Sequence, residues 1–152
     1  MKNLLSFRYL PRCGSLLFAM VILPAADALS ASTDVARIRA VLSAQVAAWN
    51  RGDIDGFMEG YARSSATEFV SGDKLTRGWE TVRDRYRKKY NSRLMMGRLT
   101  FSEIKITPLG ADTALVVGRW QLIRTSDKPH GIFTLLFRRT PAGWRIVHDH
   151  TS

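Results

Sequence analysis

The chain has 152 residues, a formal net charge of +10 and a single cysteine, Cys13. This length suits one domain with one hydrophobic core, and the lone cysteine excludes a disulfide within the chain. The basic balance leaves nucleic acid, anionic lipid and acidic ligands as classes of partner.

Residues 1–28 have the pattern of a secretory signal peptide. A basic start leads into the apolar stretch "SLLFAMVIL" and then into the small residues of "PAADALSAS". Cleavage before Leu29 or before Ala31 fits these small residues. The apolar run is roughly half of the ~20 residues that a spanning helix needs, which favours cleavage over an uncleaved anchor.

Export sets the expected location and narrows the partners. A cleaved chain lacks Cys13 and carries a net charge of about +8. We expect a periplasmic or secreted protein with no stable membrane insertion after cleavage. Nucleic acid is not a usual partner of exported proteins, so export argues against a nucleic-acid-binding function.

The segment "TDVARIRAVLSAQVAAWNRGD" predicts an amphipathic helix with Thr33 or Asp34 as its N-cap. Its apolar positions, three or four apart, are Val35, Ile38, Leu42, Val46 and Trp49. The letters "NRGD" end this helix, and Asp53 is the expected N-cap of a short second helix in "IDGFMEGY".

The next segments predict a brief strand, a turn and a second amphipathic helix. The strand is "ATEFV", the turn is "SGDK", and the helix is "RGWETVRDRYRKKYN". One face of this helix carries Trp79, Val82, Tyr86 and Tyr90. The other face carries Arg83, Arg85, Arg87, Lys88 and Lys89. Such a face is usually solvated, with an anionic partner as the alternative reading.

From Leu99 onward the pattern changes to strands joined by short turns. The runs "LTFSEIKITPLG", "ADTALVVGRWQLIRTS", "HGIFTLLFRRT" and "WRIVHDHTS" alternate apolar and polar residues between turn signals. Helices followed by an antiparallel meander predict an α+β fold with the helices on one face of a curved sheet.

The last strand contains a histidine pair that invites a metal interpretation. His148 and His150 point to the same side of a strand, and Asp149 points to the other. A metal site normally needs a third protein ligand. We therefore predict no metal site, and we interpret the histidines as hydrogen-bonded residues at a sheet end or subunit contact.

The hairpin loop "TPAG" determines on which face of the sheet the third histidine, His130, lies relative to that pair. With these four residues as the loop, Arg139 faces Trp144 and His150 faces Phe133. That register places His130 on the face opposite to His150.

The order of elements resembles the nuclear transport factor 2-like superfamily, and within it the SnoaL-like, YybH-type small domains. The similarity covers residues 33–152, and its most specific parts are the "Trp49-x-x-Gly-Asp" helix exit and the "Gly-Trp…His-x-His-x-Ser" ending. That ending is also similar to the association domain of calcium/calmodulin-dependent kinase II. The resemblance implies a cystatin-like cone, in which a strongly curved antiparallel sheet wraps around N-terminal helices. It also implies a pocket at the open end and homodimers formed through the convex side.

Strand alternation divides the sheet residues into two faces. The first face comprises Val117, Arg119, Gln121, Ile132, Thr134, Leu136, Val147, Asp149 and Thr151. The second comprises Trp120, Leu122, Phe133, Leu135, Phe137, Trp144, Ile146, His148 and His150. The second face is more apolar, so burial alone favours it for the inside. In the kinase association domain the position aligned with Arg119 faces the cone, and this resemblance favours the first face as the pocket lining.

The candidate site residues follow from that choice. Asp149 is the candidate general base, because desolvation raises the pKa of a carboxyl group. Arg119 is the candidate anion-binding residue, with Gln121 and Thr134 beside it. A buried ion pair between Arg119 and Asp149 is the structural alternative.

Aromatic residues of the helical half complete the candidate pocket. Tyr61, Trp79 and Tyr86 are the expected apolar walls and hydroxyl donors, although aromatics at helical spacing more often form core.

We expect an exported protein that binds a small-molecule ligand, partly apolar and anionic in part, as a homodimer and without a cofactor. The first alternative is a cofactor-independent isomerase, lyase (dehydratase) or cyclase with Asp149 as base. The second is a partner-binding module that uses the basic helix around Arg83 to Lys89. Apart from the turn that joins them, the two strands within 114–137 contain no carboxylate, which counts against an enzyme.

Overall fold

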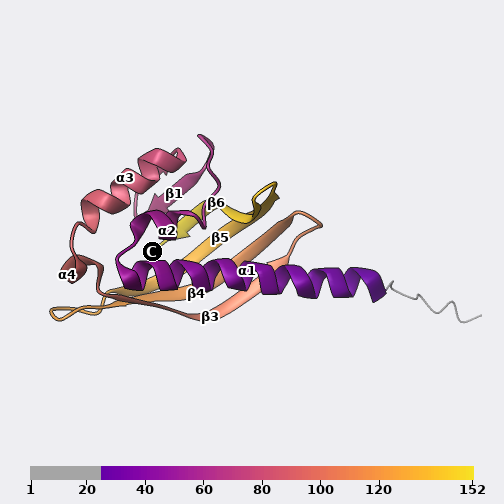
Figure 1. The fold of residues 1–152 in the computed structure, drawn as a ribbon, viewed down its shortest axis with the longest axis horizontal. Helices are drawn as coiled ribbons and strands as arrows, with labels where there is room; N and C mark the ends of the chain where they lie inside the picture. The colour runs from indigo at the N-terminus through magenta and orange to yellow at the C-terminus, as the bar shows by residue number, and fades with distance from the viewer. Residues whose placement is uncertain (1–24) are drawn as a thin grey trace, which may run out of the picture.

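The computed structural model describes residues 25–152, so the predicted signal peptide at 1–28 lies almost entirely outside the described residues. The fold is α+β, as predicted: helices cover the inner face of a curved, unclosed, six-stranded sheet (Figure 1). Within the described part of the chain, no helix is both long enough and apolar enough to cross a membrane.

The first helix, α1 (Ala25–Arg51), begins well before the predicted N-cap. Asp34 lies inside this helix, where its carboxylate accepts a hydrogen bond from the Trp144 indole at 3.1 Å. The N-cap prediction is therefore wrong, because the helix continues towards the N-terminus and Asp34 contacts the sheet instead. The predicted apolar stripe is confirmed at Ile38, Leu42 and Trp49, which are all buried.

The end of α1 is tied to the remaining elements by side-chain hydrogen bonds. Asp53 caps α2 (Ile54–Met58) as predicted, and its carboxylate accepts from the Gly56 amide at 2.7 Å. Asn50 accepts from the Leu99 amide at 2.8 Å and donates to the Leu99 carbonyl at 3.0 Å. These two bonds hold the start of a long strand against the helix.

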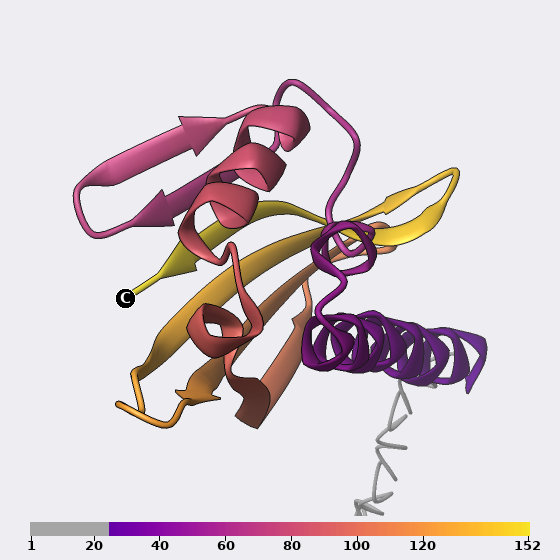
Figure 2. The same ribbon diagram turned by 60° about the vertical axis from the view of Figure 1, so that its left-hand side comes forward.

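The remaining helices are α3 (Trp79–Lys89) and the short α4 (Arg93–Met96). Helix α3 matches the predicted segment, and Figure 2 shows it lying over the end of the sheet formed by β1 (Glu68–Ser71) and β2 (Lys74–Arg77). Helix α1 packs against the other part of the sheet, where it contacts the long strands that begin at Arg98 and Gly143.

The sheet order is β2-β1-β6-β5-β4-β3. The four long strands are β3 (Arg98–Pro108), β4 (Thr113–Ile123), β5 (His130–Thr140) and β6 (Gly143–Thr151). All neighbouring pairs are antiparallel except β1 and β6, which are parallel. The sheet is thus mostly antiparallel, and the parallel pair joins β1 to the last strand, β6.

The predicted register between β5 and β6 holds only for the half next to the hairpin. Arg139 faces Trp144 as predicted, but a β-bulge follows, and His150 faces Thr134 rather than Phe133. The extra residue in β6 is Val147, which the pairing skips. Because a bulge adds one residue to one strand, every side chain after it changes face relative to simple alternation.

Candidate functional site

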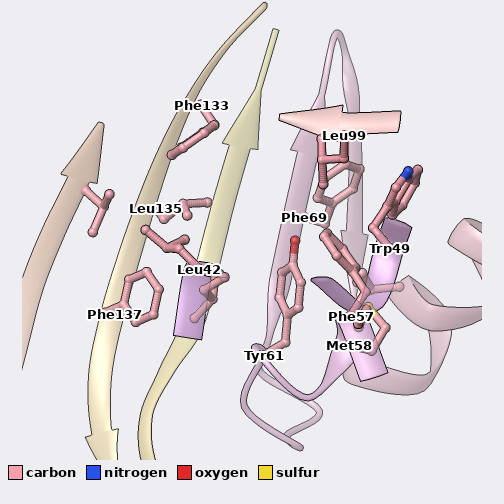
Figure 3. Packing of buried hydrophobic residues seen from close by; sticks show 14 of the residues in the cluster. Leu42, Trp49, Phe57, Met58, Tyr61, Phe69, Leu99, Phe133, Leu135 and Phe137 are labelled. Carbon is pink, nitrogen blue, oxygen red and sulfur yellow. The ribbon is translucent and has the colours of Figure 1, made fainter. Parts of the chain in front are cut away.

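A cavity of about 120 Å³ lies between the helices and the concave face of the sheet. Its walls are mainly aromatic and aliphatic, and include Trp49, Phe57, Phe69, Leu122, Phe133 and Leu135. Figure 3 shows Tyr61 between Phe57 and Phe69 on one side and Leu42 and Leu135 on the other. The volume is comparable with the roughly 150 Å³ of an apolar cavity that admits benzene.

Asp149 is the carboxylate in the wall of this cavity and is only 4 % exposed. The Tyr61 hydroxyl donates to Oδ2 at 2.6 Å, and the Thr151 hydroxyl donates to Oδ1 at 2.7 Å. Burial raises the pKa of Asp149 to about 6, although the bonds from Tyr61 and Thr151 act in the opposite direction. Each oxygen keeps a second lone pair that a bound molecule can use.

Two tyrosines extend this polar group. The hydroxyls of Tyr61 and Tyr86 lie 3.4 Å apart, and both side chains line the cavity. Burial, and then the charge of Asp149, raises the pKa of both tyrosines well above 10. Both phenols are therefore neutral at physiological pH. The single O–H of Tyr61 is donated to Asp149, and the O–H of Tyr86 can be donated to Tyr61 or to a ligand.

The bulge at Val147 is what turns Asp149 inward. Trp144 and Ile146 face the core before the bulge, and Asp149 and Thr151 face it afterwards. The predicted assignment of Asp149 and Thr151 to the cavity side is correct.

The rest of that face assignment, which placed Arg119, Gln121 and Thr134 in the pocket, is wrong. These residues lie on the convex side, since Trp120, Leu122, Phe133 and Leu135 of β4 and β5 line the cavity. Arg119 is half exposed there and donates to Glu103 at 2.8 Å. Burial of the more apolar face decided the orientation, and the anion-binding prediction for Arg119 had assumed the opposite one.

Trp79 is also misplaced by the sequence prediction. It is buried, its indole donates to the Met58 carbonyl at 3.0 Å, and the Arg63 guanidinium lies 4.4 Å from its ring. It does not line the cavity, so it belongs to the structural core between α2 and α3. Tyr61 and Tyr86 do line it, as predicted.

The cavity wall also contains two cations, Arg85 and Lys89, which the sequence pattern assigns to the outer basic face of α3. The spacing held a usable signal, because these residues follow the buried Val82 by three and seven positions and thus share its side of the helix.

The histidines lie outside the cavity. His148 is hydrogen-bonded to Glu68 at 3.0 Å, and His150 is exposed. After the bulge His150 shares a face with His130, contrary to the predicted register. Within residues 25–152 no group of three or more His, Cys, Asp or Glu side chains is placed to hold a metal ion.

A second hollow, of about 320 Å³, lies between the start of α1 and the turn joining β3 to β4. Its carboxylate, Asp34, is already engaged by Arg139 and by the Trp144 indole. Because this carboxylate has its partners within the fold, we place the candidate site in the cavity that contains Asp149.

The curved sheet wrapped around helices, with a cavity between them, defines the nuclear transport factor 2-like class of α+β proteins. A model of the SnoaL-like domain matches residues 38–152. The chain belongs to this SnoaL-like domain family. None of the curated proteins compared with the chain matches it.

Solved structures support the same assignment. A nuclear transport factor 2-like protein of unknown function from Shewanella oneidensis is 39 % identical, with a TM-score of 0.75 over 78 % of this chain and 98 % of that one. A protein with a cystatin-like fold from Novosphingobium aromaticivorans is 21 % identical, with a TM-score of 0.67 over 83 % and 85 % of the two chains.

A third structure, assigned as a calcium/calmodulin-dependent protein kinase II association domain from Xanthomonas campestris, is 14 % identical. Its TM-score is 0.59 over 76 % of this chain and 84 % of that one. The likeness in these last two cases shows a shared fold.

Proposed function

We propose that this protein binds a small, largely apolar molecule in the cavity, with Asp149 as the hydrogen-bond acceptor for a polar group of that molecule. The observation that carries the proposal is a buried carboxylate in the wall of an otherwise mainly aromatic and aliphatic cavity. Burying a charge in such surroundings is costly, and a binding site is a common reason for keeping one there.

The ligand proposed from the walls is about the size of a single ring. The cavity is smaller than the roughly 300–1,000 Å³ of typical drug-sized sites, so a compact molecule fits it best. Aromatic walls favour a flat or alicyclic ring. Asp149, which is mostly ionised at neutral pH, favours a hydroxyl or amine donor on that ring.

Export is part of the same proposal and rests on the sequence pattern of residues 1–28. We propose that the ligand is met in the periplasm or outside the cell. Detection of the mature N-terminus by mass spectrometry after secretion tests this location.

Phenol and toluene test the binding proposal, because they differ in a single donor group. We expect both to bind the wild-type protein at pH 7.5, and phenol to bind more tightly. Asp149→Asn should weaken phenol about tenfold, since a charged acceptor makes a stronger hydrogen bond than a neutral one, and should leave toluene unchanged. Quenching of Trp49 and Trp120, which line the cavity, provides the signal.

Asp73→Asn is the control for that experiment, because Asp73 is an exposed carboxylate in the turn between β1 and β2. It should change neither affinity. Absence of binding of both compounds, or equal loss of phenol and toluene in Asp149→Asn, would count against the proposal.

The second candidate is an enzyme in which Asp149 is a general base, of the isomerase, lyase or cyclase type. It is favoured by the raised pKa of Asp149, about 6, which places the carboxyl close to the value for proton transfer at neutral pH. In this scheme Asp149 takes a proton from carbon, and Tyr86 donates a hydrogen bond to the oxygen that gains charge, because the Tyr61 hydroxyl is already donated to Asp149.

Hydrogen exchange at the carbon next to a carbonyl tests the enzyme. Cyclohexanone in deuterated water should exchange its α-protons faster with the protein, and the rate should rise as the pH passes about 6. Asp149→Asn should lower this rate by about 10²–10⁴-fold. Exchange that persists in Asp149→Asn would remove Asp149 from the catalytic role.

The partner-binding module predicted for the basic helix has less support. Arg83 and Arg87 pair with Asp84 and Asp55, and two further cations of the helix line the cavity. Fewer unpaired positive charges of α3 are therefore available to a macromolecular partner.

A further inference from the structure

The cations of α3 fall into two groups that the sequence does not separate. Arg83 and Arg87 each form an ion pair with a carboxylate and are not among the residues that line the cavity. Arg85 and Lys89, one helical turn apart, line the cavity together. Among residues 25–152, neither of these two has a carboxylate partner within ion-pair distance.

Arg85 is held in place by neutral groups. Its Nη1 donates to the Thr76 hydroxyl at 2.7 Å, and its guanidinium lies 4.8 Å from the centre of the Phe69 ring. A guanidinium has five N–H donors, so a single bond to a hydroxyl leaves most of them for another acceptor. Because the stacked guanidinium is already oriented, binding an anion costs it little conformational freedom.

Lys89 adds a second positive charge at the exposed end of the same wall. Its ammonium lies 5.3 Å from the Tyr90 ring, and the side chain is exposed. The half-buried Arg85 and the exposed Lys89 therefore mark the side of the cavity that meets solvent.

The cavity wall carries one carboxylate, Asp149, and one half-buried guanidinium, Arg85, and Phe69 lies next to both. Phe69 on β1 is the register partner of Asp149 on β6, and Arg85 lies over the Phe69 ring. Asp149 is buried, whereas Arg85 is half-buried. An anion near Asp149 would be repelled, and the same anion near Arg85 would be attracted.

We propose that Arg85, assisted by Lys89, binds the carboxylate of a small aromatic or alicyclic acid, whose ring occupies the apolar cavity and whose far end points to Asp149. The proposal rests on the proposed binding function and names the class of ligand for that site. Arg85 is then the residue that selects an acid over a neutral compound of the same shape, the role that the sequence had suggested for Arg119.

Benzoate and benzamide are the probes, since they have nearly the same shape and differ in charge. At pH 7.5 and low salt we expect the wild-type protein to bind benzoate at least about tenfold more tightly than benzamide. Arg85→Gln should weaken benzoate about tenfold or more and leave benzamide within about twofold. Titration calorimetry on the folded variants measures both affinities.

Further variants keep the test decisive if Arg85→Gln disturbs the fold. Arg85→Lys retains the charge but not the planar set of donors, so its benzoate affinity should fall between those of the other two proteins. Lys89→Gln should cause a smaller loss. Lys88→Gln removes an exposed cation of the same helix that does not line the cavity, and it should leave benzoate binding unchanged.

Salt provides an independent readout. Raising sodium chloride from about 0.05 M to about 0.5 M should weaken benzoate and not benzamide, because screening acts on the charged pair. A salt effect of the same size on both probes would contradict the carboxylate subsite.

The outcomes separate the two proposals. Benzamide binding as tightly as benzoate, or benzoate affinity unchanged in Arg85→Gln, overturns the carboxylate subsite and leaves the binding cavity standing. Failure of benzoate, benzamide, phenol and toluene to bind overturns both.

Discussion

At the scale of single residues, Asp149 is the group that most distinguishes this cavity from ordinary core. Its carboxylate is buried, it accepts hydrogen bonds from Tyr61 and Thr151, and its pKa is raised to about 6. Desolvation raises the pKa of this carboxyl by more than the two hydrogen bonds lower it. The protein therefore keeps a carboxylate where its ionisation at neutral pH is unfavourable to stability.

That penalty predicts a specific pH dependence. The pKa is about 6 in the folded protein and 3.8 in the reference state, so the folded state binds the proton more tightly. Asp149 costs nothing below pH 3.8, and its cost grows as the pH rises to 6. Relative to wild type, Asp149→Asn should gain up to about 3 kcal/mol in free energy of unfolding across this interval.

Urea denaturation at several pH values between 4 and 7 measures this difference. Any hydrogen bond altered by the substitution shifts the variant's stability by a constant amount, whereas the predicted effect is a change with pH. Asp73→Asn, in an exposed turn, should follow the wild-type curve. Parallel curves for wild type and Asp149→Asn would show that burial does not raise this pKa.

Residue identity was only partly predictable from the sequence. The sequence predicts Asp149, Tyr61 and Tyr86 in the cavity, because a carboxylate on the last strand and aromatic residues of the helical half are typical of such a pocket. It does not predict Arg85 there, since a basic helix face looks uniform until ion pairs within the fold divide it. Arg119 lies on the convex face, contrary to what the family resemblance implies, because burial of the more apolar face determines the orientation of the strands.

At the scale of elements, one inserted residue decides which side chains meet. Strand alternation is a reliable guide only between irregularities, and Val147 interrupts it in β6. The elements themselves followed from periodicity: α3 and the four long strands lie where the patterns predicted them. A bulge carries no clear sequence signal, so the inner faces of β5 and β6 could not both be assigned from the sequence.

The junction of α1 with β3 yields an element-scale prediction. The Asn50 side chain satisfies both the amide and the carbonyl of Leu99. Asn50→Ala would leave these two partly buried backbone groups without their partner and should lower the free energy of unfolding by about 2–4 kcal/mol. Asn91→Ala, at an exposed position after α3, should change it by less than about 0.5 kcal/mol.

Thermal and urea unfolding of the three proteins measure these differences. We expect the binding of cavity probes to survive in Asn50→Ala at temperatures where the variant is folded, since Asn50 does not line the cavity. A loss no larger than that of Asn91→Ala would mean that water replaces the side chain at Leu99.

At the scale of the whole molecule, the order of elements specified the architecture. Helices followed by a meander have few ways to bury one face of a curved sheet, which is why the fold class could be predicted without coordinates. The cavity could not, because its volume depends on how side chains from five strands and three helices fill the space between them. Its oppositely charged side chains, Arg85 and Asp149, come from elements far apart in the sequence.

The predicted homodimer remains a prediction, and the convex face of the sheet is where it is tested. Ile132 is 45 % exposed and Val117 is 37 % exposed on neighbouring strands of this face. Burying them against a second copy would remove apolar surface from water.

Sedimentation equilibrium should give a dimer for the wild-type protein and a monomer for Ile132→Asp, because the new carboxylate would be desolvated at the interface. Leu109→Asp changes a more exposed leucine, 58 % exposed, at the β3–β4 turn and should stay dimeric. A wild-type monomer at all concentrations, or dissociation by Leu109→Asp as well, would contradict an interface on this face.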